Sequence, residues 1–116
     1  MANDRARLDA HLPLRPVEFH ILLSLSTGER HGYGIIQDIE ARGEAAPDVG
    51  TMYRALARLV EHTLIEGVPS RESADERRIN YCITALGTRV ARAEARRLEA
   101  LARVARVSGL LTRKAT

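Results

Sequence analysis

The segment from Asp48 to Leu64 restricts the fold more strongly than any other part of this chain. Its larger apolar residues have the i, i+4, i+7, i+8 spacing of a helix with one buried face: Met52, Leu56, Leu59 and Val60. Asp48 suits the N-cap position, because its carboxylate can accept hydrogen bonds from the unpaired N–H groups of the first turn. The segment therefore predicts an amphipathic helix that begins directly after Asp48.

The opposite face of this predicted helix carries groups that suit the major groove of DNA. These groups belong to Thr51, Tyr53, Arg54, Arg58 and Glu61. Arginine pairs with guanine or holds phosphate, and the hydroxyl groups of threonine and tyrosine donate to phosphate oxygens. The alternative is an ordinary amphipathic helix with a solvated outer face. This segment alone does not decide between the two interpretations, so its neighbours have to.

Two further short helices are predicted before this segment. Pro16 suits the first turn of a helix, and an apolar face follows it as far as Leu25. After a polar break, a second helix begins near His31-Gly32 and ends near Arg42-Gly43. Three short helices with tight connections are typical of a helix-turn-helix domain, in which the third helix reads the DNA.

After Leu64 the hydrophobic period changes from helical to two. The segment from Leu64 to Val68 reads as a strand that Pro69 ends, and Ile79, Tyr81 and Ile83 alternate with polar residues as a second strand. A lone hairpin is marginally stable, so it must pack against the helices. We therefore predict a mainly α fold with a small β-hairpin, a winged helix-turn-helix domain over residues 14–83, preceded by a flexible arm over residues 1–13.

A long helix over residues 84–111, capped by Thr84, follows the hairpin, and residues 112–116 form a tail. About 25 helical residues span about 37 Å, which is more than a three-helix core can cover. The apolar ribbon of this helix is therefore expected to meet a second subunit. The expected dimerisation residues are Val90, Leu98, Leu101, Ala102 and Ala105.

Composition and charge qualify the DNA hypothesis. The chain is 45% hydrophobic but only 3% aromatic, which indicates a thin aliphatic core that a dimer would supplement. The net charge is +3, yet residues 84–116 carry eight basic and two acidic residues, whereas residues 29–66 carry four arginines and seven acids. Bulk charge therefore does not support DNA binding by the reading helix, and any positive potential there must come from the placement of individual side chains.

Three blocks of sequence resemble the PadR-like transcriptional regulators. They are Phe19–Leu25 continuing to His31–Ile35, Gly50–Leu56, and Asp75–Arg78 continuing through Tyr81–Thr84 to Gly87. The resemblance covers about residues 14–111. It implies a dimeric winged-helix repressor that binds a pseudo-palindromic operator and releases it on binding a small molecule. The chain is similar to the short branch of the family, which has a single C-terminal dimerisation helix.

The predicted DNA-binding residues are Thr51, Tyr53, Arg54, Arg58, Arg77, Arg78, His31 and Tyr33. Five of them have a competing interpretation. Arg58 either contacts DNA or pairs with Glu61 at i+3. His31 either meets phosphate or caps the second helix, and Tyr33 lies either at the interface or in the core. Arg77 and Arg78 either contact DNA from the wing or sit in a solvated hairpin beside two acids.

The absence of tryptophan bears on the expected effector. Some members of the family sandwich planar drugs between tryptophans at the dimer interface, and this chain has none. Any effector is therefore expected to be small, apolar or phenolic, and bound near the two-fold axis of the dimer without tryptophan stacking.

Other function classes receive less support. A winged helix that binds only proteins is the main alternative, because residues 29–66 are acidic overall. No catalytic constellation or cofactor loop is visible, so we expect no enzyme and no cofactor. The four histidines lack metal-ligand spacing, and Cys82 is the only cysteine, so no metal site or internal disulfide is expected. Without a signal peptide or an apolar stretch of about 20 residues, the expected location is the cytoplasm, with no membrane association.

Overall fold

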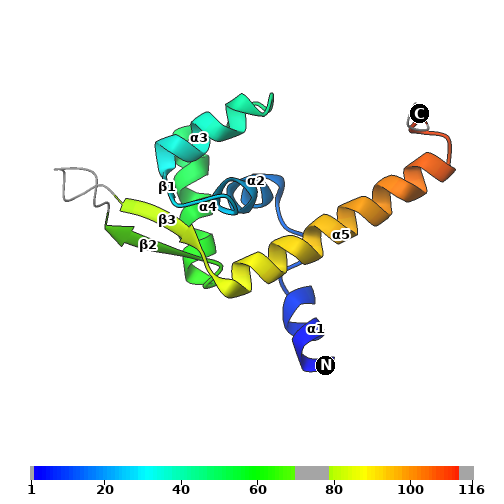
Figure 1. Cartoon of the computed structure of the whole chain (residues 1–116), viewed down its shortest axis with the longest axis horizontal. Coiled ribbons are helices and arrows are strands. Elements are labelled where there is room, and N and C mark those ends of the chain that lie inside the picture. Colours follow the sequence, from blue (N-terminus) through cyan, green and yellow to red (C-terminus); the bar gives the residue numbers. More distant parts are fainter. Residues whose placement is uncertain (1, 70–78, 113–116) are drawn as a thin grey trace.

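The computed structural model describes residues 2–69 and 79–112. The elements are α1 (Ala2–Asp9), α2 (Pro16–Leu25), β1 (Arg30–His31), α3 (Gly32–Ala41), α4 (Val49–Glu61), β2 (Ile65–Pro69), β3 (Ile79–Ile83) and α5 (Ala85–Val107). Helices α2, α3 and α4 pack together, the sheet lies at one end of them, and α5 projects away from the body (Figure 1). The predicted winged helix-turn-helix fold is confirmed. No helix in the described ranges is long and apolar enough to cross a membrane.

The core is aliphatic and lies between the three short helices, the start of β2 and the start of α5. Its buried members are Leu14, Ile21, Leu22, Leu25, Ile35, Ile39, Met52, Ala55, Leu56, Leu59, Leu64, Ile65 and Val90. The predicted stripe on α4 is correct for Met52, Leu56 and Leu59, but Val60 is 40% exposed and Ala55 is buried instead. At 100° per residue, Ala55 and Val60 flank the arc of the three buried residues on opposite sides and at equal angles, so the helical period does not distinguish them and the packing of neighbouring elements decides which one is buried.

The sheet contains the predicted hairpin and one additional strand. The strand order is β1-β3-β2, and both pairings are antiparallel. Strand β1 has only two residues, which pair with Tyr81 and Asn80, and a strand this short has no readable period. Within β3, Tyr81 and Ile83 pack against the core, whereas Ile79 is exposed because it pairs with Pro69 at the far end of the hairpin.

The predicted flexible arm over residues 1–13 is wrong, because Ala2–Asp9 forms helix α1. Leu8 and Leu12 pack against the hydrophobic core, and the Asp4 carboxylate pairs with the Arg89 guanidinium of α5. These contacts join the N-terminal segment to α5, as Figure 1 shows for the two helices. The composition of residues 1–13 is mixed, so the sequence did not indicate a helix with an apolar face. That face is recognisable only in the folded chain, where α5 lies against it.

Helix α5 begins as predicted and ends earlier than predicted. The Thr84 side chain accepts from the Gly87 N–H at 2.9 Å, which caps the helix. The helix ends at Val107 instead of Leu111, because Gly109 adopts a left-handed φ of 83° and the Leu110 N–H bonds back to the Ala105 carbonyl at 2.9 Å. Glycine is favoured at such a C-terminal position, since it has no Cβ to oppose a positive φ.

The first half of α5 belongs to the subunit's own core. Val90 is fully buried there, so its predicted role in dimerisation is wrong: its apolar partners lie within the same chain. Glu94 is also buried, and its carboxylate accepts from the Leu14 N–H at 2.9 Å and from the Arg97 guanidinium. Glu94 therefore attaches the segment between α1 and α2 to α5.

Candidate nucleic-acid interface

Helix α4 separates its side chains into a buried face and an open face. Met52, Ala55, Leu56 and Leu59 are buried, while Tyr53 is 49% exposed and Arg54 is exposed. The predicted cap is confirmed, because the Asp48 carboxylate accepts from the Thr51 N–H at 2.8 Å. The buried face fixes the rotation of the helix about its axis, so Tyr53 and Arg54 are presented to solvent from a rigid support.

Three side chains at the start of α4 form a directed hydrogen-bond chain. The Thr51 hydroxyl donates to Asp48 Oδ2 at 2.9 Å, and Arg54 Nη2 donates to Thr51 Oγ1 at 3.2 Å. Hydrogen bonds from the backbone N–H and the hydroxyl of Thr51 lower the pKa of Asp48, and the charge of Arg54 adds to this effect. Because Thr51 uses its only hydroxyl proton on Asp48, it does not donate to a phosphate in this arrangement.

Tyr53 joins α4 to the start of α3 and to the sheet. A Cβ atom added to Gly32 would lie 2.8 Å from the Tyr53 hydroxyl oxygen, so the phenol rests directly against the first residue of α3. Tyr53 also influences Tyr81 of β3, whose pKa is raised by burial and, to a smaller extent, by Tyr53. The phenol of Tyr53 is therefore placed where α3, α4 and β3 meet.

The start of α3 contributes two aromatic rings. His31 is the N-cap, and its Nδ1 atom accepts from the Gly34 N–H at 3.0 Å, so the capping interpretation is correct. Tyr33 is 61% exposed, which rules out the core interpretation, and its ring stacks parallel to that of His31 with centroids 6.5 Å apart. Gly32, which the Tyr53 phenol contacts, lies between His31 and Tyr33 in the chain, so these two residues flank that contact.

Arg58 has a structural partner that the sequence did not indicate. Its Nε atom lies 3.1 Å from Oε2 of Glu18, a buried carboxylate on α2. Of the two interpretations left open for Arg58, the pairing with Glu61 is therefore replaced by a pairing with Glu18. Forty residues separate Arg58 from Glu18, so no local spacing rule connects them. The ion pair attaches α4 to α2 and gives the half-exposed Arg58 side chain a partner within the chain.

The wing is anchored by an interaction on the described side of the hairpin. Asn80 Nδ2 donates to Glu29 Oε1 at 2.9 Å, which ties β3 to the loop before β1. The predicted wing contacts Arg77 and Arg78 lie outside the described residues.

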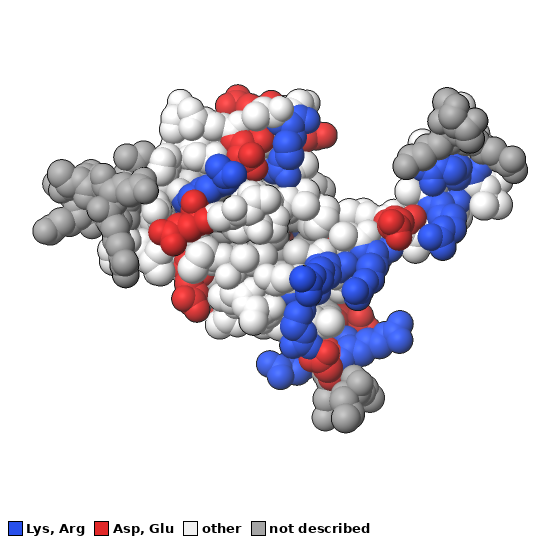
Figure 2. Space-filling model, in the orientation of Figure 1, with Lys and Arg blue, Asp and Glu red and all other residues white. Residues whose placement is uncertain are grey.

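The charge distribution follows the sequence count. On the face that Figure 2 presents, Lys and Arg gather along α1 and α5, while acidic and basic residues are mixed over the three-helix part. Residues 29–66, which include the reading helix, carry four arginines and seven acids, so the basic excess of the chain lies outside them. Individual side chains such as Arg54 have to supply the positive charge of that surface.

The distal half of α5 is an open apolar ribbon. Leu101 is 58% exposed, Leu98 is also exposed, and Ala102 and Ala105 are half-buried. Val104 and Val107 continue this ribbon and are exposed as well. In Figure 1 this part of the helix projects beyond the rest of the chain.

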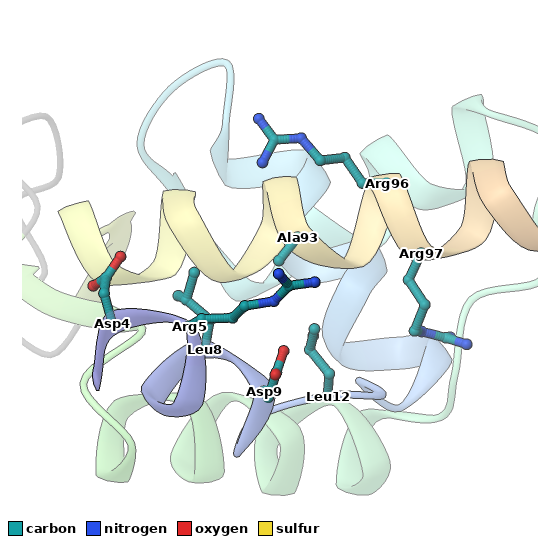
Figure 3. A pocket seen from close by; sticks show the side chains of 8 residues that line it. All are labelled: Asp4, Arg5, Leu8, Asp9, Leu12, Ala93, Arg96 and Arg97. Atoms are coloured by element: carbon teal, nitrogen blue, oxygen red, sulfur yellow. The ribbon is translucent and has the colours of Figure 1, made fainter. Parts of the chain in front are cut away.

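A groove of about 900 Å³ runs between α1 and α5. Its lining residues are Asp4, Arg5, Leu8, Asp9, Leu12, Ala93, Arg96 and Arg97. Figure 3 shows the Arg5 side chain extending from α1 toward Ala93 on α5, with Asp9 and Leu12 on the side away from α5. The lining of the groove therefore combines apolar and charged side chains.

Comparisons with known proteins agree on one family. The profile that matches residues 21–93 is described as the transcriptional regulator PadR-like family. No curated protein matches the sequence. Among solved structures, a PadR family transcription regulator from Clostridium difficile R20291 is 27% identical, with a TM-score of 0.70, and the alignment covers 77% of this chain and 93% of that chain.

Two more distant structures share the fold. A transcriptional regulator from Clostridium thermocellum is 24% identical with a TM-score of 0.71, covering 83% of this chain and 90% of that one. Bacillus subtilis PadR in complex with operator DNA is 20% identical with a TM-score of 0.61, covering 70% of this chain and 47% of that longer protein.

Proposed function

We propose that this chain, which belongs to the transcriptional regulator PadR-like family, is a homodimeric repressor that binds a pseudo-palindromic operator. The chain is a DNA-binding transcription regulator, and as a repressor it would act by occupying DNA, without catalysis, in the cytoplasm. The observation that carries the proposal is the open face of α4. Tyr53 and Arg54 are exposed on this face, while the apolar residues on the opposite face of the helix are buried in the core.

The proposed DNA contacts come from two adjacent helix starts. Arg54 has five N–H donors, of which the bond to Thr51 uses one, so the others are available for guanine O6 and N7 or for phosphate. Tyr53, Tyr33 and His31 surround the start of α3 and would contact phosphates there. We retain Thr51 as the residue that orients Arg54, and we omit Arg58 because Glu18 holds it.

The wing arginines remain part of the proposal. Their position follows from the sequence alone, because a wing of a winged helix lies beside the minor groove or the phosphate backbone. We propose that Arg77 and Arg78 contact phosphates there. Such contacts would position the protein on the duplex without adding sequence preference.

The proposal of a dimer rests on α5. Two reading helices enter successive major grooves only when a dimer holds them about 34–36 Å apart. The open ribbon of Leu98, Leu101, Ala102 and Ala105 lies outside the hydrophobic core of the described residues and is suited to a symmetric helix pair. The small alanines would let the two helices approach closely.

We propose that release from DNA is controlled by a small apolar or phenolic effector that binds near the two-fold axis. The supporting observation is the groove between α1 and α5, whose lining includes Leu8, Leu12 and Ala93. Its charged walls, which include Arg5 and Arg97, favour an effector with an acidic or phenolic group over a purely apolar one.

The test of the proposal is DNA binding as a function of salt. Duplexes selected from genomic DNA by the purified protein should bind much more weakly at about 200 mM salt than at about 50 mM, because phosphate contacts release counterions. Arg54→Ala should weaken binding by about 5- to 150-fold. Binding that does not depend on salt, or no binding at all, would favour the alternative of a protein-interaction module.

Arg92→Ala is the matched control for Arg54→Ala. Arg92 is an exposed arginine on α5, far along the chain from the reading helix, so its loss removes the same charge from a different surface. Its affinity for the operator should stay within about twofold of the original protein. Equal losses for the two variants would mean that only net charge matters, which contradicts a reading role for Arg54.

A further inference from the structure

An acidic side chain lies at the N-terminal end of α4, which faces DNA in the proposed function. Asp48 is exposed and accepts two hydrogen bonds from Thr51, one from its N–H and one from its hydroxyl. A carboxylate there repels phosphate, and Ser or Asn caps a helix about as well as Asp. Capping therefore does not require the negative charge, although the helix dipole favours it by a small amount.

The carboxylate of Asp48 and the guanidinium of Arg54 lie on the same side of the first turn. A Cβ atom added to Gly50 would lie 3.3 Å from Asp48 Oδ1 and 3.2 Å from Arg54 Nη1, so the bare glycine stands between the two charged groups. Thr51 bridges them through its hydroxyl. The outer end of α4 thus offers a strong acceptor and a strong donor side by side, in fixed order.

This pair of groups matches one base pair of the major groove better than the others. Guanine presents two acceptors, O6 and N7, which suit Arg54, and its partner cytosine presents the N4 amino donor, which suits a carboxylate. If thymine O4 or a phosphate oxygen took the place of that amino group, two hydrogen-bond acceptors would face each other and repel. A carboxylate beside the reading arginine therefore discriminates by repulsion as well as by attraction.

We propose that Asp48 is a specificity-determining residue, which accepts from a cytosine amino group beside the guanine that Arg54 binds and excludes thymine and phosphate from that place. Thr51 holds the two groups in a fixed relative position, because its hydroxyl donates to the Asp48 carboxylate and accepts from the Arg54 guanidinium. The inference rests on the proposed function of α4 as the reading helix. It adds a base preference and a named residue to that function.

Asp48→Asn is the variant that separates charge from capping. Asn keeps the size of the side chain and a carbonyl oxygen for the Thr51 N–H, so α4 should retain its cap. Asp48→Ser is a second neutral cap with a shorter reach. Both variants should melt within a few degrees of the original protein by circular dichroism, which establishes that any change in DNA binding comes from the lost charge.

The measurement is fluorescence anisotropy on the selected operator and on duplexes with each base pair of a half-site replaced in turn. For the original protein, replacing cytosine by thymine at one position should cost at least about fivefold in affinity. Asp48→Asn and Asp48→Ser should lose the part of that preference that the carboxylate supplies, keep the part that Arg54 supplies through guanine, and bind random duplexes more tightly. Arg54→Ala should lose the guanine preference of the same base pair.

The outcomes distinguish this inference from the proposed function. If the original protein binds operator and random duplexes equally, or binds neither, the proposed function fails. If it discriminates well but both neutral variants keep the same base preference at every position, then Asp48 serves only as a cap and the inference is overturned.

Discussion

Tyr53 of α4 and Gly32 of α3 are in direct contact: a Cβ atom at Gly32 would lie 2.8 Å from the phenol oxygen and 3.1 Å from Cζ. The missing side chain at Gly32 thus makes room for the ring of Tyr53. This contact sets where the phenol stands on the proposed interface. It also couples the positions of the two helices that contribute DNA contacts.

Gly32→Ala should therefore displace Tyr53 without changing α4 itself. We expect operator binding to weaken by about 1 kcal/mol, roughly fivefold, because one phosphate hydrogen bond is lost. Gly34→Ala is the matched control, since a Cβ there meets only ordinary contacts, at 3.5 Å from His31 Cε1. In a Tyr53→Ala background the Gly32 substitution should add no further loss, and an additive loss would contradict the coupling.

Gly87 marks the junction between the sheet and α5. A Cβ atom there would lie 2.0 Å from the Leu64 carbonyl oxygen, and this backbone atom cannot rotate away. Gly87→Ala should lower the free energy of unfolding by about 3 kcal/mol in a urea titration, at the upper end of typical overpacking costs. Gly67→Ala should cost less than about 1 kcal/mol, because its Cβ would lie 3.1 Å from the Cγ2 methyl of exposed Ile79 and in ordinary contact with the Tyr81 ring, and both are side chains that can shift. Similar losses for both variants would contradict this account of the junction.

Acid should weaken the attachment of the N-terminal segment. The rings of His11 and His62 meet edge to face with centroids 5.9 Å apart, and burial, then His62 and then Arg7 lower the pKa of His11 below 6.5. The unfolded chain therefore binds the proton more readily than the folded chain. The contribution of neutral His11 to the free energy of unfolding is complete above pH 6.5. It is lost as the pH falls below 6.5 and through the lowered pKa of His11 in the folded chain.

Thermal melts between about pH 7 and pH 5.5 would check this prediction. The original protein should lose stability over this range, and His11→Gln should show a shallower loss because its side chain does not titrate. Glu18, Arg15 and Arg58 line the same small cavity as the two histidines, so Arg15→Gln serves as a control that removes charge without removing the titrating group. An unchanged pH slope in His11→Gln would refute the assignment to His11.

Dimerisation should depend on the distal half of α5. Replacing Leu98 and Leu101 by Glu would bury four like charges across a symmetric seam, at a cost of several kcal/mol. The double variant should sediment as a monomer and lose operator affinity while keeping its circular dichroism spectrum. Replacing Ala100 and Arg103 by Glu adds the same residues on the opposite side of the helix and should leave a dimer. A dimer in the Leu98 and Leu101 variant would place the interface elsewhere.

Short-range features of this fold are legible in the sequence because they depend on neighbouring residues. Asp48 and Thr84 were predicted as caps, and each accepts a backbone N–H three residues later. The apolar period of α4 gave Met52, Leu56 and Leu59 their buried positions. The change from a helical period to a period of two after Leu64 predicted the hairpin of β2 and β3, and the three blocks of family resemblance implied the same winged-helix topology.

The remaining features depend on partners that are distant in the chain. Arg58 pairs with Glu18 and not with Glu61, Glu94 accepts from the Leu14 N–H 80 residues away, and α1 becomes helical where α5 covers it. Val90 looked like part of a dimer seam, because a helical period reports which face is apolar but not what covers that face. Val90 packs into the core of its own subunit, and this position follows from the packing of α5 against α2, which the sequence does not reveal.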